Sequence, residues 1–172
     1  WKISNENFLL NNSTLSNLKL RASYGLTGNQ AIGPYESLAI YRVQPPSEVG
    51  GAFGVDLARE ANPDLKWETS YQTNIGVDVG LFEDRITFSL DYYNIDTEDL
   101  LAVDRASNFY LETSDLDVLR NVGSVNNNGI EFSITSNNIN KNDFRWTTNF
   151  NIARNRNQIV ELSGGTEILG SG

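Results

Sequence analysis

The sequence predicts an all-β fold, an antiparallel meander of long amphipathic strands within one domain that covers residues 1–172. Three observations predict it. Apolar and polar residues alternate with period two along several runs. These runs reach about 10 residues, whereas strands of soluble proteins average about 5 or 6. The connections between them alternate between brief turns and long segments, which is typical of β-barrels that span a membrane.

The first strand is expected near residues 18–25, where leucines alternate with Lys19 and Arg21. Before it, residues 5–11 allow a helical turn capped by Ser4. The chain starts without an initiator methionine or a signal peptide, so we expect it to be a piece of a longer protein.

A long hairpin follows, with strands near residues 69–81 and 86–96 joined by a short turn at residues 82–85. Each strand is long enough to cross a bilayer when tilted. The face that meets lipid is expected to carry Ile75, Val77, Phe88 and Leu90.

A second long hairpin is expected from strands near residues 129–137 and 144–155, joined by an asparagine-rich turn at residues 137–143. Long connections near residues 26–68 and 97–127 complete the pattern. In outer-membrane barrels the short turns are periplasmic and the long loops are extracellular.

Aromatic residues fall near both ends of these strands, as in the aromatic belts of membrane proteins. The outer row is predicted to contain Trp67, Tyr71, Tyr92 and Tyr93, and the inner row Phe82, Phe144 and Trp146. The alternation alone also fits a soluble β-sandwich, in which the apolar face would pack against a second sheet.

The composition excludes several classes of function. The chain has no Cys, Met or His, which removes thiol nucleophiles, imidazole bases and most ligands of zinc, copper and haem. A formal net charge of -9 opposes binding to nucleic acid. We therefore expect no enzyme activity, no cofactor and no nucleic-acid partner.

Five segments, taken in order, resemble the SusC/RagA family of TonB-linked (TonB-dependent) outer-membrane transporters. They are LKLRASYGLTGNQ (18–30), NPDLKWETS (62–70), GLFEDRITFSLDYYNIDTEDLL (80–101), NVGSVNNNGIEFSI (121–134) and FRWTTNFNIARNRNQIVEL (144–162). Any one of them is an ordinary amphipathic strand, but five in this order are specific.

The resemblance implies that the chain is a C-terminal part of a transmembrane β-barrel of about 22 strands. It also implies import of glycans or oligopeptides across the outer membrane of a Gram-negative, Bacteroidetes-like bacterium. The implied partners are outer-membrane lipid, the rest of the barrel and its plug domain, a SusD-like surface lipoprotein, and TonB through the missing N-terminal part. A soluble β-sandwich for carbohydrate binding or adhesion, and a TonB-dependent siderophore or cobalamin receptor, remain alternatives.

Candidate site residues follow from these expectations. Trp67, Phe109 and Tyr110 are candidates for substrate binding, and Asp78, Asp91 and Glu131 are candidates for the polar face towards the lumen. Gly76 and Gly80 on that face would give room for the plug or let the sheet bend. Carboxylates at Glu112, Asp115 and Asp117 lack the spacing of a calcium loop, so no metal site is predicted.

Overall fold

The structure, a computed structural model, describes residues 1–9, 12–45, 51, 53–106 and 116–162. The chain divides into two compact units. The first consists of Trp1–Thr27, Ser70–Asp96 and Asn126–Gln158, and the second of Gly28–Thr69, Thr97–Val125 and Ile159–Gly172. No helix among the described residues is long and apolar enough to cross a membrane.

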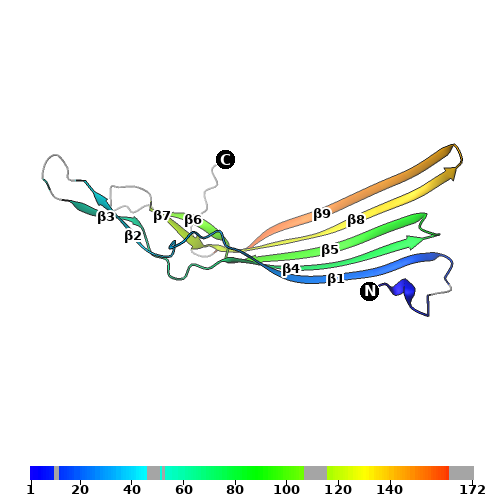
Figure 1. The fold of residues 1–172 in the computed structure, drawn as a ribbon, viewed down its shortest axis with the longest axis horizontal. Helices are drawn as coiled ribbons and strands as arrows, with labels where there is room; N and C mark the ends of the chain where they lie inside the picture. Colours follow the sequence, from blue (N-terminus) through cyan, green and yellow to red (C-terminus); the bar gives the residue numbers. More distant parts are fainter. Residues whose placement is uncertain (10–11, 46–50, 52, 107–115, 163–172) are drawn as a thin grey trace. The chain divides into compact units, whose positions relative to one another are not determined.

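The first unit is built on a five-stranded sheet in the order β1-β4-β5-β8-β9, whose strands lie side by side in one layer (Figure 1). The strands have 13 to 19 residues. Their bounds are Leu15–Asn29 for β1, Glu68–Leu81 for β4, Ile86–Glu98 for β5, Gly123–Lys141 for β8 and Phe144–Leu162 for β9. The all-β antiparallel fold expected from the sequence is therefore confirmed.

Side-chain hydrogen bonds define the antiparallel register. Ser16, near the start of β1, accepts a hydrogen bond from the amide of Asp84, which follows the end of β4. Ser23, further along β1, accepts a hydrogen bond from Asn74 within β4. The two strands therefore run in opposite directions. The same reversal relates β8 to β9, in the pairs Thr135–Asn149 and Asn127–Asn157.

The turn between β4 and β5 has an unusual backbone. Phe82, Glu83 and Asp84 have φ angles of 56°, 56° and 60°, a region that non-glycine residues rarely adopt. Hydrogen bonds from the amides of Phe82 and Asp84 to the Thr14 carbonyl (2.8 Å) and Ser16 Oγ (3.0 Å) stabilise it. The neighbouring strand thus holds this turn in place.

The turn between β8 and β9 is shorter than expected. Residues 137–141, which the sequence analysis assigned to an asparagine-rich turn, continue strand β8. Their side chains bond across the strand pair, since Thr147 donates to Asn137 (2.9 Å) and Asn138 donates to Thr148 (2.7 Å). Asparagine favours turns, but here its amide serves a cross-strand ladder.

The N-terminal segment also differs from expectation. Its short 3-10 helix covers Ile3–Asn5 and includes Ser4, so the expected cap at Ser4 is wrong. Of the helical turn expected at residues 5–11, the described part contains a turn closed by the hydrogen bond from the Leu9 amide to the Glu6 carbonyl (2.9 Å), and residues 10–11 lie outside the described residues. Lys2 pairs with Lys19 in an antiparallel bridge, and Trp1 exchanges backbone hydrogen bonds of 2.8 Å with Leu20. The chain start therefore lies against β1.

The second unit contains two short hairpins within the segments expected to be loops near 26–68 and 97–127. One pairs β2 (Ile40–Gln44) with β3 (Gly54–Arg59), and the other pairs β6 (Leu101–Ala106) with β7 (Leu116–Asn121). Val118 of β7 is 2% exposed and is the buried apolar side chain of the described residues. These hairpins are too short to produce a clear alternating pattern in the sequence.

Candidate functional site

One face of the five-stranded sheet carries exposed apolar side chains. Ile75 is 49% exposed, Leu90 43%, Ile130 51% and Ile152 59%, although each lies in the interior of a regular strand. Phe88 and Phe132 contact each other on this face, with ring centroids 6.1 Å apart. No apolar side chain of the first unit is buried among its described residues, so this face has no second sheet against it.

Polar residues bound the apolar face at both ends of the strands. At the end where the long connections begin, an amide and carboxylate cluster contains Asn94, Asp96, Asn126 and Asn128, and the Asn126 amide donates to Asn94 at 2.8 Å. At the turn end, Ser136 donates to Asn138 at 2.8 Å on the same face. The apolar residues therefore form a band, which is what a lipid-facing wall requires.

The opposite face is polar and contains an ion cluster centred on Arg21. Its Nε and one terminal nitrogen each lie 2.9 Å from a carboxylate oxygen of Asp78, and that terminal nitrogen also lies 2.8 Å from Asp91. A side chain at Gly76 would clash with Arg21 and Asp91, because both lie over this glycine. Three strands thus contribute one cation and two anions to a single cluster.

A second group on the polar face joins Tyr93, Gly129 and Asn155. The Tyr93 hydroxyl donates a hydrogen bond of 2.9 Å to Asn155. A Cβ atom built on Gly129 would lie 2.7 Å from the Tyr93 ring, so the ring lies directly over the glycine. Tyr93 therefore belongs to the polar face, and its expected place in an outer aromatic belt is wrong.

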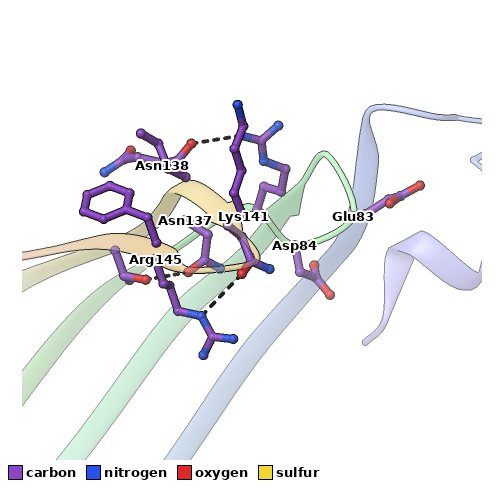
Figure 2. Close-up of a pocket in the computed structure, with 11 residues that line it drawn as sticks. Glu83, Asp84, Asn137, Asn138, Lys141 and Arg145 are labelled. Carbon is purple, nitrogen blue, oxygen red and sulfur yellow. Dashed lines mark hydrogen bonds between the residues drawn. The ribbon is translucent and has the colours of Figure 1, made fainter.

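An open hollow of about 970 Å³ lies at the turn end of this unit, next to the β4–β5 and β8–β9 turns. Figure 2 shows Glu83, Asp84, Lys141 and Arg145 around it, together with asparagines of β8. Arg145 Nε donates to Asn140 at 3.4 Å. The lining is charged and amide-rich, with both signs of charge present.

In the second unit, Asn121 connects three backbone groups. Its Nδ2 donates to the carbonyls of Lys66 (2.9 Å) and Asp99 (2.7 Å), and its Oδ1 accepts from the Lys66 amide (2.9 Å). Glu68 accepts from the Leu101 amide at 2.9 Å. Trp67, between these anchored positions, remains 55% exposed.

Comparison with known proteins identifies the family. Residues 5–168 match the family model described as "TonB dependent receptor-like, beta-barrel". The chain belongs to the TonB-dependent receptor β-barrel family. The resemblance found in the sequence is thereby confirmed.

Curated relatives agree with this assignment. TonB-dependent receptor P3 of Formosa agariphila is 44% identical over 173 residues, a match that covers 98% of this chain and 17% of the relative. TonB-dependent receptor SusC of Bacteroides thetaiotaomicron is 37% identical over 175 residues, covering 97% of this chain and 17% of that protein. The relatives are named as receptors and not as enzymes.

Solved structures give the same fold. A chain of the RagAB peptide importer in its "closed-closed" state matches with a TM-score of 0.78 and 31% identity, covering 96% of this chain and 18% of that one. The TonB-dependent receptor barrel segment described here thus spans less than a fifth of these relatives. The soluble β-sandwich alternative is wrong, because the chain belongs to a barrel family.

The predicted site residues have different positions in this TonB-dependent receptor segment. Asp78 and Asp91 lie together in the Arg21 cluster, whereas Glu131 is exposed and makes no side-chain hydrogen bond or ion pair within the described residues. Phe109 and Tyr110 lie outside the described residues. Groups of acidic side chains able to hold a metal ion are absent from the part of the chain that the structure describes.

Arg21, Tyr93 and Asn121 were not among the site residues predicted from the sequence. Arg21 was assigned to the polar face, but its partners are 57 and 70 residues away. The register of β1, β4 and β5 brings these groups together, and the alternating pattern of the sequence does not predict that register.

Proposed function

We propose that this chain is a wall and loop segment of an outer-membrane importer energised through TonB. The apolar band faces lipid, the polar face lines the barrel interior, and the long connections form part of the extracellular mouth. In this arrangement Asp78, Asp91 and Glu131 face the lumen. The segment itself contributes structure and a vestibule, and no catalytic role is proposed.

One observation carries the proposal: a single sheet layer has an exposed apolar band on one face and an ion cluster on the other. In water, such a band would be an aggregation hazard. In a bilayer it is the expected outer surface, and the polar face is then directed to the barrel interior.

In outer-membrane barrels the short turns are periplasmic and the long loops are extracellular, and this rule gives the orientation of the strands in the membrane. The turns at residues 82–85 and 142–143 are brief, and the connections at the other strand ends are long. We therefore place the brief turns in the periplasm and the two short hairpins outside the cell, in a Gram-negative bacterium similar to those of the relatives.

The proposed cargo is a glycan or an oligopeptide, and the proposed partner at the surface is a SusD-like lipoprotein. Support comes from the similarity to SusC and to the RagAB peptide importer. Trp67, Phe109 and Tyr110 are the proposed cargo contacts, since aromatic rings stack on sugars and on apolar peptide side chains. A siderophore or cobalamin is the alternative cargo.

Cysteine labelling of the full-length protein in native outer membranes tests the wall assignment. This segment has no cysteine of its own, so Ile75→Cys and Asn74→Cys report neighbouring positions on opposite faces. We expect a lipid-soluble maleimide to label position 75, and a small water-soluble maleimide to label position 74 only. Labelling of position 75 by the water-soluble reagent would refute the lipid-facing band.

Growth of a strain that lacks the full-length gene tests the cargo. We expect loss of growth on one glycan or on oligopeptides as sole carbon source, restored by complementation. Normal growth on all of them, with loss of uptake of iron siderophores or cobalamin, would favour the alternative cargo.

A further inference from the structure

Two arginines of β9 follow directly after the apolar band on the same face of the sheet. Phe150 and Ile152 are exposed on this face by 53% and 59%. Since side chains of a strand alternate between faces, Arg154 and Arg156 continue the row that these two residues form. Both arginines are exposed, and both lie in the half of β9 that is further from the short β8–β9 turn.

The register identifies their neighbours on β8. Asn157 donates to Asn127, and Thr135 donates to Asn149, so Arg154 lies across from Ile130, the last apolar residue of β8 on this face. Arg156 lies across from Asn128 in the amide cluster. The pair therefore begins at the height where the apolar band ends and polar side chains begin.

Neither guanidinium has a protein partner in the described part of the chain. No ion pair or side-chain hydrogen bond involves Arg154 or Arg156 there, whereas Arg21 on the other face is paired with two aspartates. The nearest carboxylate of the amide cluster, Asp96, is bonded by Asn94 and Asn126. In a chain with a net charge of -9, two adjacent unpaired cations are a local feature and not a consequence of a basic composition.

We propose that Arg154 and Arg156 form a binding site for the phosphate groups of lipid headgroups in the outer leaflet. Arginine side chains near the end of an apolar band extend their charged groups to the headgroup region. A guanidinium matches phosphate oxygens in a bidentate geometry and remains charged at any physiological pH. The site rests on the proposed orientation of the strands in the outer membrane, and it concerns a lipid ligand separate from the cargo.

Lipid retention by the full-length protein tests the site. The wild type and the Arg154→Gln/Arg156→Gln double variant are reconstituted in nanodiscs that contain either phosphorylated or dephosphorylated lipid A. Bound lipid is then counted by native mass spectrometry after gentle release into detergent. Arg145→Gln is the matched control, because this arginine lies on the same strand but at the opposite end and on the other face.

We expect the wild type to retain phosphorylated over dephosphorylated lipid A. Each substitution should lower this preference about fivefold, given the usual attraction of one arginine to an anionic membrane surface. The Arg145→Gln control and the charge-conserving Arg154→Lys/Arg156→Lys variant should keep most of it. An excess of free inorganic phosphate should not remove the lipid, because the acyl chains anchor it at the band.

Three outcomes would overturn the site. They are equal retention of both lipids by the wild type, unchanged retention by the double glutamine variant, and displacement of the lipid by free phosphate. A double variant whose retention is unchanged but whose thermal stability falls would show that carboxylates of a neighbouring strand pair with these arginines instead. Since cysteine labelling at Ile75 reports the wall assignment independently, failure of the arginine site is distinguishable from failure of the proposed function.

Discussion

The contact between Tyr93 and Gly129 predicts how much a side chain at position 129 lowers the stability of the barrel wall. In a Gly129→Ala variant the new methyl group would lie 2.7 Å from two carbons of the Tyr93 ring and from its hydroxyl oxygen, whereas carbon atoms in normal contact are about 3.5–4.0 Å apart. The ring must therefore move about 1 Å and release its hydrogen bond to Asn155. Overpacking of this kind costs about 1–2 kcal/mol, and the lost hydrogen bond adds about 1 kcal/mol.

Part of this loss is offset, because alanine restricts the unfolded chain more than glycine and stabilises by about 0.5–1 kcal/mol. The net effect expected for Gly129→Ala is a loss of about 1–2.5 kcal/mol. The assay is denaturant unfolding of the full-length protein in lipid vesicles, followed by the band shift between folded and unfolded protein on unheated gels. Gly25→Ala is the control, since nothing lies within 4 Å of a Cβ atom there, and it should be neutral or slightly stabilising.

A double-mutant cycle tests the physical cause. In a Tyr93→Ala background the methyl group at position 129 meets open space, so Gly129→Ala should no longer destabilise. The expected coupling between the two substitutions is about 2–3 kcal/mol, the sum of the overpacking and hydrogen-bond terms. Equal destabilisation in both backgrounds would refute the reasoning, because the clash with the ring would then not be the cause.

The other predictions concern the ion cluster, the apolar band and the second unit. Arg21→Gln leaves its two aspartate partners close together without a cation, and it should lower the stability of the full-length protein by about 1–2 kcal/mol. The expected loss is modest because the cluster is partly exposed. An added Asp91→Asn substitution should restore part of the lost stability. Ile75→Arg places a charge in the apolar band, which is proposed to face lipid, and should destabilise by about 2–4 kcal/mol in the unfolding assay. Asn74→Arg on the other face should change stability by under about 1 kcal/mol. Asn121→Ala removes three hydrogen bonds to backbone groups and should speed proteolysis of the second unit several-fold, while the barrel band on gels stays intact. Unchanged cleavage would show that these bonds do not hold the second unit in place.

The alternating pattern predicted the two faces of the sheet but not the partners on them. Ile75 and Leu90 are on the exposed apolar face because period two fixes the side on which a strand residue lies. The pattern does not fix which residue of the next strand lies opposite, since that depends on register. For this reason Arg21 was not connected with Asp91, and Tyr93 was assigned to an aromatic belt when it covers Gly129.

The asparagines near the end of β8 explain a second difference between the sequence prediction and the structure. Residues 137–143 were expected to form a turn because asparagine favours turns and tolerates left-handed backbone. In the structure the left-handed residues of the β4–β5 turn are Phe82, Glu83 and Asp84, none of which is an asparagine, while Asn137 and Asn138 bond across to β9. Residue preference is therefore a weak guide where a neighbouring strand offers hydrogen-bond partners of its own.

The glycines of the polar face show which side chains occupy the space over that face of the sheet. Gly76 and Gly80 were interpreted as leaving room for a plug or letting the sheet bend, but side chains of this same segment occupy the space over them. Arg21 and Asp91 lie over Gly76, and Tyr93 lies over Gly129. Long polar side chains can thus lie flat along the wall and bond to adjacent strands, which keeps them ordered and limits how far they extend from the sheet. A wall whose polar side chains lie flat and pair with one another leaves room for another domain inside the barrel. This fits the plug domain that the family resemblance implies better than an open pore that binds ions along its length.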